Sequence, residues 1–306
     1  MNVKIYTIDI SNPTCWNSII LEFKPQILKV LNKMRPLFSS YITFINAGLI
    51  IYRLAGGIFL YEDEIEVVAK LLNITFVECL LFQLTYELCS ACTSSILQID
   101  TGEYVHVRTM DWEMSELKAL TINIKVVNGD IHLFNAVTWA GFIGIFTGYK
   151  PDRYSISLNY RRTSNPNFLS NIKSAFQGYF PNAFFIRNLL STYSDEKQAF
   201  YRIKSTHIIA PAYYTFLSNT IKCSIIRDRT TFSIKEAPCV QTNCDEVNQG
   251  DNIMYSFERI SYMNDIITIK PTLNYLVNYI NQWPVQNEHT IYTVIMTPKG
   301  ILYFNI

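Results

Sequence analysis

Two alternating runs of residues, separated by one tight turn, constrain the fold of this chain more than any other feature. The first run begins at Cys92 and ends at the Asp-Thr-Gly turn of residues 100–102. The second begins at Tyr104 and continues to Arg108 and Asp111. Alternation of this kind on both sides of a glycine turn predicts an antiparallel hairpin. In that hairpin the arginine and the aspartate come back beside the cysteine.

The predicted hairpin gathers a thiol, a fixed positive charge and a carboxylate at one strand end. Such a set is typical of a nucleophile site. The residues alone leave two other interpretations open. A buried cysteine that begins a strand is more often inert core, and Arg108 with Asp111 is also compatible with a surface ion pair of little energetic value.

The composition bounds the class of protein. With 306 residues, 49% hydrophobic content and a net charge of +1, the chain is globular with ample core. We expect one large domain, or a small helical lobe on a larger α/β body. The sequence has no run of Lys and Arg, so nucleic acid is not an expected partner. The low charged fraction of 17% suits either a lipid-handling surface or a large core.

The N-terminus and the cysteines bear on the compartment. Residues 1–6 lack the apolar stretch of about 7–15 residues that a signal peptide needs, so none is expected. The most apolar segment, Tyr41–Tyr52, is interrupted by Asn46 and is too short to span a bilayer. Seven cysteines, an odd number, argue against a full disulfide framework.

The organisation of the chain changes at Cys92. Residues 1–91 predict mainly helices, over Pro25–Met34, Glu62–Leu72 and Phe76–Ser90. After Cys92 short alternating strands dominate, and the sequence predicts strands over 120–127, 131–137, 154–160, 223–226, 231–234, 290–296 and 301–305, with helices over 183–191, 194–203 and 272–281. This succession predicts an α+β protein built in layers.

The segment 86–94, together with Arg108–Asp111, resembles the cleavage junction and active-site hairpin of the acid ceramidase family. That family includes an acid amidase that hydrolyses N-acylethanolamines. Further matches follow in the same order along the chain, at residues 6–10, 140–151, 154–159, 209–214, 226–229, 240–243 and 291–294. The resemblance implies the N-terminal-nucleophile hydrolase fold, a four-layer αββα sandwich of two antiparallel sheets between helical layers.

The resemblance also implies that the chain is cut between Ala91 and Cys92. Residues 1–91 would then be a helical pro-segment, or α-subunit, that stays bound to a catalytic β-subunit of residues 92–306. A cysteine freed in this way carries a thiol and an α-amine on one residue. The amine titrates near about 7.7–8.0, low enough to relay protons at mild pH.

Site roles follow from the same resemblance. Cys92 is implied as the nucleophile and, through its amine, the acid/base group. Asp111 would hold the α-ammonium, and Arg108 would steady the thiolate or the developing oxyanion. Asn243 would supply an oxyanion-hole amide, although it is equally suited to capping a turn. Arg259 matches a family arginine when a short insertion before it is allowed.

The chain departs from the family pattern at two places. The family sequence Leu-Asn-Glu-Arg reads Leu-Asn-Tyr-Arg at residues 158–161, so that Tyr160 replaces a carboxylate. The cysteines that join the two pieces in secreted members are missing, because none precedes Tyr6 and none follows Arg259. The family is lysosomal, whereas these features favour an intracellular variant or a secretion route without those bridges.

No metal or cofactor is expected. Cys89 and Cys92 form a Cys-x-x-Cys pair that Cys239 and Cys244 would complete as zinc ligands, but the spacing is loose and no histidine stands close. The leading hypothesis is a cysteine amidase that hydrolyses a fatty-acyl lipid amide, a ceramide or an N-acylethanolamine, to a fatty acid and an amine. Contact with a membrane or micelle surface is part of it. The alternative is a catalytically inactive relative that binds lipid or a partner protein.

Overall fold

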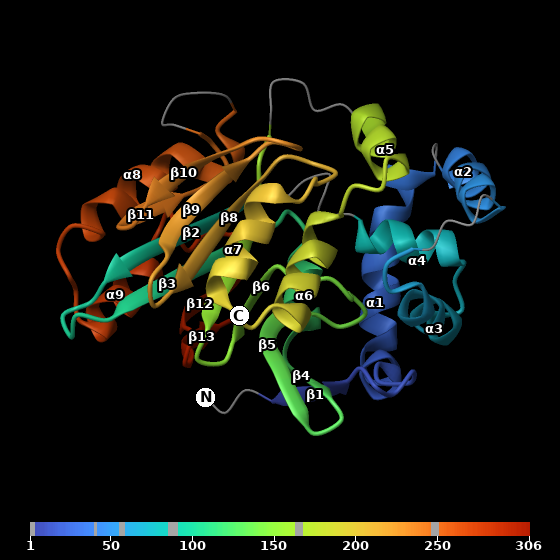
Figure 1. Ribbon diagram of the computed structural model, residues 1–306, viewed down its shortest axis with the longest axis horizontal. Coiled ribbons are helices and arrows are strands. Elements are labelled where there is room, and N and C mark those ends of the chain that lie inside the picture. The colour runs from blue at the N-terminus through green and yellow to red at the C-terminus, as the bar shows by residue number, and fades with distance from the viewer. Residues whose placement is uncertain (1–3, 40–41, 55–58, 85–90, 163–167, 246–250) are drawn as a thin grey trace.

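Two β-sheets lie face to face in the middle of the protein, with helices on their outer sides (Figure 1). The computed structural model describes residues 4–39, 42–54, 59–84, 91–162, 168–245 and 251–306. The larger sheet has eight strands in the order β1-β4-β5-β6-β7-β8-β9-β10, and the smaller has five in the order β11-β2-β3-β12-β13. This arrangement confirms the expected α+β sandwich.

The strands and helices have the following bounds. The strands are β1 (Ile5–Asp9), β2 (Ala91–Gln98), β3 (Tyr104–Asp111), β4 (Thr121–Asn128), β5 (Ile131–Trp139), β6 (Thr147–Lys150), β7 (Tyr154–Tyr160), β8 (Ala212–Ser218), β9 (Lys222–Arg227), β10 (Phe232–Glu236), β11 (Cys239–Gln241), β12 (Thr290–Thr297) and β13 (Gly300–Asn305). The α-helices are α1 (Asn17–Phe38), α2 (Ile42–Leu54), α3 (Glu62–Leu72), α4 (Phe76–Gln83), α5 (Phe168–Phe176), α6 (Asn182–Thr192), α7 (Glu196–Ser205), α8 (Ser256–Ile266) and α9 (Leu273–Ile280). Short 3₁₀ helices occupy Ser115–Leu120 and Ile253–Tyr255.

Each sheet buries its outer face against helices. On the smaller sheet, Val105 and Val107 of β3 belong to the same apolar cluster as Met263 of α8 and Leu276 of α9. On the larger sheet, the Tyr154 hydroxyl of β7 donates to a backbone carbonyl of α6. Helices α6 and α7 therefore form one outer layer and α8 and α9 the other, while α1 to α4 gather at one side of the molecule (Figure 1).

The predicted hairpin around residues 100–102 forms as expected. Strands β2 and β3 pair antiparallel, with Cys92 opposite Met110 and Ser94 opposite Arg108. The neighbouring strand β12 then pairs with the other edge of β3. The hairpin is thus held in the middle of the smaller sheet, which fixes the positions of its side chains.

The segment before Cys92 is not only helical. Strand β1 pairs parallel with β4 at the edge of the larger sheet. The mainly helical prediction for residues 1–91 does not include this strand. The predicted helix over Phe76–Ser90 is observed as Phe76–Gln83, capped by a reciprocal Thr75–Glu78 box, and residues 85–90 lie outside the described residues. None of the helices within the described residues is long and apolar enough to cross a membrane.

Two buried polar contacts join the N-terminal segment to the rest of the chain. Arg187 of α6 forms an ion pair with Glu64 of α3 at 2.8 Å, and Trp16 Nε1 donates to the same carboxylate at 2.5 Å. Gln83, at the end of α4, donates to the carbonyl oxygen of Gly141 at 2.9 Å and accepts from the Ile143 backbone N–H at 2.7 Å. One carboxamide therefore satisfies two buried backbone groups across the predicted cleavage boundary.

We expect Gln83→Ala to lower the free energy of unfolding by about 2 kcal/mol or more, because it leaves two buried backbone groups without their partner. Urea unfolding followed by circular dichroism measures this. The matched control is Gln98→Ala, which removes a hydrogen bond to the Gly102 carbonyl at an exposed site and should cost about 0.5 kcal/mol or less. Equal decreases in the free energy of unfolding of the two variants would contradict a special stabilising role for Gln83.

Candidate active site

Cys92 lies at the start of β2 and is fully buried between the two sheets. Its Sγ is 3.6 Å from the Sδ of Met110, the residue opposite it in the hairpin. Its backbone N–H donates to Oδ1 of Asn243 at 2.6 Å. The thiol thus faces a soft apolar neighbour, while the backbone nitrogen faces a polar one.

Asp111 and Arg259 form a buried ion pair beside the cysteine. Arg259 Nη1 is 2.9 Å from Asp111 Oδ2, and both side chains are fully buried. The other carboxylate oxygen accepts from the Thr290 hydroxyl at 2.7 Å. Burial raises the pKa of the Asp111 carboxyl, and the Arg259 guanidinium opposes that rise. Asp111 stands opposite Ala91 in the hairpin, so the pair adjoins the predicted cleavage point.

Arg259 connects most of the site. From α8 it donates to Thr93 Oγ1 at 2.9 Å and to Asn243 Oδ1 at 3.2 Å, in addition to Asp111. It also donates to the Ser256 hydroxyl at 3.0 Å. The fold therefore brings Arg259 into the site, although its match to the family arginine required a short insertion in the alignment.

Arg108 is held by a residue that sequence reasoning did not single out as a site residue. Its Nη1 donates to Oδ1 of Asn159 at 2.6 Å, and its Nη2 lies 3.6 Å from Met110 Sδ. The Asn159 amide nitrogen donates to the carbonyl oxygens of Gln241 at 2.8 Å and Cys92 at 3.3 Å. Polar residues at alternate positions of the buried strand β7 were the available signal.

Asn243 presents its oxygen, not its nitrogen, to Cys92. Oδ1 accepts from the Cys92 N–H and from Arg259, while Nδ2 donates to the Tyr160 carbonyl at 2.8 Å. The amide that was expected to donate to an oxyanion is thus engaged elsewhere in this uncut chain. Its oxyanion role stays a prediction.

The five sequence-predicted site residues come together, as Cys92, Arg108, Asp111, Asn243 and Arg259 are all buried in one region. The interpretation of Arg108 and Asp111 as a surface pair is therefore wrong. Within the residues that the structure describes, no group of three or more His, Cys, Asp or Glu side chains could hold a metal ion. Cys89, the remaining member of the alternative zinc set, lies outside the described residues.

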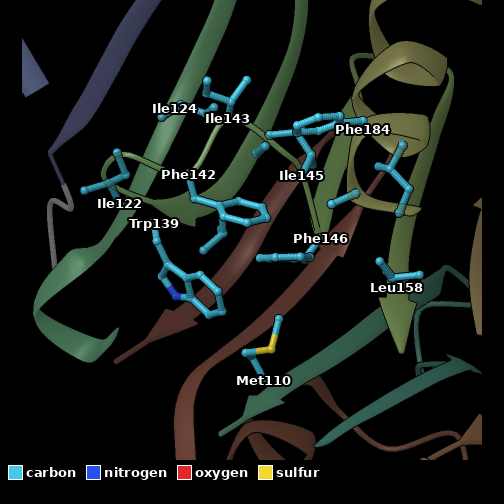
Figure 2. Close-up of a cluster of buried hydrophobic side chains, with 14 of the residues drawn as sticks. Met110, Ile122, Ile124, Trp139, Phe142, Ile143, Ile145, Phe146, Leu158 and Phe184 are labelled. Carbon is cyan, nitrogen blue, oxygen red and sulfur yellow. The ribbon is translucent and has the colours of Figure 1, made fainter. Parts of the chain in front are cut away.

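An apolar cluster begins where the polar site ends. Figure 2 shows Met110 at one end of it, next to Trp139 and Phe146. Phe142 stacks on Phe146 with ring centroids 4.5 Å apart. The thiol of Cys92 thus lies between hydrogen-bonding groups that suit charged intermediates and an apolar region that suits a hydrocarbon chain.

Comparison with known proteins gives one consistent result. No protein-family model matches the chain. Acid ceramidase of Pan troglodytes is 28% identical over 327 residues, which cover 90% of this chain and 81% of the relative, and that of Homo sapiens is 27% identical with the same coverage. The uncharacterized protein R632 of Acanthamoeba polyphaga mimivirus is 26% identical over 317 residues, 98% of this chain and 97% of the relative.

The solved structures agree with the sequence relatives. The Caenorhabditis elegans ortholog of N-acylethanolamine-hydrolyzing acid amidase superposes with a TM-score of 0.58 and 26% identity, covering 68% of this chain and 93% of that chain. Sequence similarity to acid ceramidase over 90% of this chain and a fold shared with the amidase therefore point to the same family. In both sequence and fold, this chain is similar to acid ceramidase and to N-acylethanolamine-hydrolyzing acid amidase.

Proposed function

We propose that this protein is a cysteine amidase that hydrolyses the amide bond of a fatty-acyl lipid, a ceramide or an N-acylethanolamine, after cutting its own chain before Cys92. At the family level, the named relatives support a lipid amide hydrolase. The single observation that carries the proposal is the position of the Cys92 nitrogen. It lies 2.6 Å from Asn243 Oδ1, beside the buried Asp111–Arg259 pair, where a newly formed α-amine would find hydrogen-bond partners.

The first step of the proposed chemistry is the cut itself. The Cys92 thiol attacks the carbonyl carbon of Ala91, a thioester forms, and the carbon–nitrogen bond between the two residues breaks. The freed nitrogen takes up the thiol proton. Water then hydrolyses the thioester, which leaves a carboxylate on Ala91 and a free thiol and amine on Cys92.

Turnover repeats the same acyl transfer on the substrate. The thiolate attacks the amide carbonyl of the lipid, and the α-ammonium of Cys92 gives its proton to the departing amine. Water hydrolyses the acyl thioester and releases the fatty acid. Arg108 supports this chemistry because its guanidinium is charged at any working pH and, buried between the sheets, acts in a region of low dielectric.

Asp111 and Arg259 set the charge around the amine. A carboxylate that already balances a buried guanidinium is poised to balance an ammonium next to it, since Asp111 stands opposite Ala91 in the hairpin. Asn243 Oδ1 offers the amine an acceptor in the position it already occupies. All the residues that the chemistry needs are thus present and assembled, and no observation favours the alternative of a catalytically inactive relative.

The acyl chain needs an apolar slot, which we place next to Met110. Residues 140–146, which we propose as one wall of that slot, are fully buried in the apolar cluster of Figure 2 while the chain is uncut. The slot would therefore open by movement after the cut. Away from that place, an apolar cavity of about 220 Å³ lies between α1, α2 and α4 and is lined by Leu31, Met34, Arg35, Ser39, Ile42, Ile74, Glu78 and Leu81.

Helix α2 offers a surface for contact with a membrane or micelle. Leu54 is 82% exposed and Ile50 is 53% exposed, and both belong to the apolar stretch 41–60. Phe176 of α5, which is also about half exposed, lies against Gly48 of α2. Exposed apolar side chains on adjacent helices support the proposal that this face rests on a lipid surface.

We expect the purified chain to be cut between Ala91 and Cys92, and faster at acidic pH because the leaving nitrogen must gain a proton. Intact-mass analysis over time at pH 4.5 and 7.5 detects the fragment that begins at Cys92. Cys92→Ala should stay whole, whereas Cys223→Ala, which removes an equally buried thiol from β9, should be cut like the wild type. If the wild-type chain never yields this fragment, Cys92 has no free α-amine, and the proposed acid/base group does not exist.

Arg108→Ala, Asp111→Asn and Asn243→Ala should each lower amide turnover by roughly two orders of magnitude, as the loss of preorganised electrostatic groups does. Steady-state rates are measured on cut protein, with circular dichroism as the folding control. Arg153→Ala, at an exposed position, should keep the wild-type rate. Near-wild-type turnover in the Arg108 variant would contradict the proposed role of the site residues.

Long-chain N-acyl amides should be hydrolysed with stimulation by detergent or anionic lipid, and short soluble amides or peptides only slowly, because a hydrocarbon chain fills an apolar slot. Leu54→Glu should reduce the stimulation, while Leu21→Glu, 61% exposed on α1, should not. With Tyr160 in place of a carboxylate, competition at equal acyl length should favour the less polar amine group. Preference for short peptides would refute the lipid assignment.

A further inference from the structure

The two sheets meet across a row of buried polar side chains that the proposed chemistry does not use. His106 of β3 lies between two serines of β7, with Nδ1 3.0 Å from Ser155 Oγ and Nε2 2.8 Å from Ser157 Oγ. Ser157 Oγ is 2.9 Å from Ser94 Oγ, which is 2.7 Å from Asn159 Oδ1. All five side chains are fully buried. The row therefore leads from the histidine to the residue that holds Arg108.

The orientation of the Asn159 carboxamide is determined by its neighbours. Its Nδ2 faces the carbonyl oxygens of Gln241 and Cys92, and its Oδ1 faces the Arg108 guanidinium. The reversed carboxamide would place acceptor against acceptor on one side and donor against donor on the other. Asn159 Oδ1 must therefore be the atom that meets Ser94.

This orientation fixes the direction of the hydrogen bonds that lead from Asn159 to His106 Nε2. Asn159 Oδ1 only accepts, so the single hydroxyl proton of Ser94 is committed to it. Ser157 must then donate to Ser94, which commits its own proton. His106 Nε2 consequently carries a hydrogen and donates to Ser157. In a neutral ring Nδ1 then carries no hydrogen and accepts from Ser155.

The surroundings of His106 favour the uncharged ring. Its neighbours in the sheet are Ile96 on β2 and Met296 on β12, and from the facing sheet it meets the two β7 serines. The charged group acting on it is Arg108, two residues along the same strand face. Burial, followed by this positive charge, lowers the pKa of His106 to about 3.

We propose that His106 is a positioning residue: as a neutral imidazole with its proton on Nε2, it reinforces, through Ser157 and Ser94, the orientation of the Asn159 carboxamide that holds Arg108 and the Cys92 carbonyl. Arg108 then has an acceptor at 2.6 Å that is unable to turn away. The positive charge of Arg108 is thereby held beside Cys92, although the Asp111 carboxylate forms its ion pair with Arg259. The kinetic part of this inference rests on the function proposed above, whereas its structural part does not.

The histidine tautomer tests the structural part without any activity. Nitrogen NMR on full-length protein with labelled histidine resolves four side chains, and His106→Gln identifies the signals of residue 106. We expect the pattern of a neutral ring protonated on Nε2, unchanged between pH 8 and pH 5. An Nδ1-protonated ring, or titration within that range, would overturn the inference. If His106→Gln fails to fold, the signals are those that shift in Ser157→Ala and not in Ser224→Ala.

Ser157→Ala tests positioning, because it breaks the row and leaves the histidine in place. The matched control, Ser224→Ala, removes a fully buried hydroxyl of β9 that has no hydrogen-bond partner within the described part of the chain. We expect Ser157→Ala to lower the cutting rate and kcat about tenfold with little change in KM, and the control to stay within about twofold. Equal decreases in cutting rate and kcat in the two variants would mean that the row contributes only packing, and would overturn the proposal.

The outcomes separate this inference from the proposed function. A wild-type chain that is neither cut nor active would defeat the proposed function, while the tautomer still decides whether the row has the inferred direction. A cut and active chain whose His106 is protonated on Nδ1 would keep the function and refute the row.

Discussion

The buried ion pair between Asp111 and Arg259 is the interaction on which the arrangement of the site depends. Removing two charges from water costs several kcal/mol per ion, and that cost is recovered only when every remaining hydrogen-bonding position is filled. Here Thr290 of β12 occupies the second carboxylate oxygen and Thr93 of β2 shares the guanidinium. Helix α8 and three strands of the smaller sheet must therefore meet before the pair is stable, which ties the helix layer to the site.

The fold could be predicted where local pattern and final environment agree. Strand β7 was predicted with its observed bounds, Tyr154–Tyr160, and the β4–β5 hairpin to within two residues at each end. Helix α8 was missed because its buried face includes Ser256 and Arg259, so its apolar spacing is weak. Helix α1 extends well beyond the predicted Pro25–Met34, since tertiary packing of its buried apolar residues outweighs the disruption by two internal prolines.

The site was predictable in proportion to how much of it lies within one hairpin. Alternation and a turn were enough to bring Cys92, Arg108 and Asp111 together, because register follows from the turn. Asn243 and Arg259 needed the family resemblance, since they lie more than a hundred residues away in sequence. Contacts between the sheets, such as Asn159 with Arg108, have no local signature, because the spacing within a strand does not say which residue of another sheet it will face.

Strand alternation also explains how one strand, β2, serves two environments. Cys92 and Ser94 face the larger sheet, with Cys92 against Met110 of the neighbouring strand β3 and Ser94 against Asn159 of β7. Thr93 faces Arg259 of α8. The proposed cut between Ala91 and Cys92 would change the connectivity at the start of β2 without breaking the pairing with β3, because that pairing continues to Gln98. The piece before the cut has its own attachments through β1 and Gln83. The proposed cut would thus free the Cys92 nitrogen while the strand pairing that positions Cys92 stays intact, and movement would be needed only in the apolar residues beside Met110.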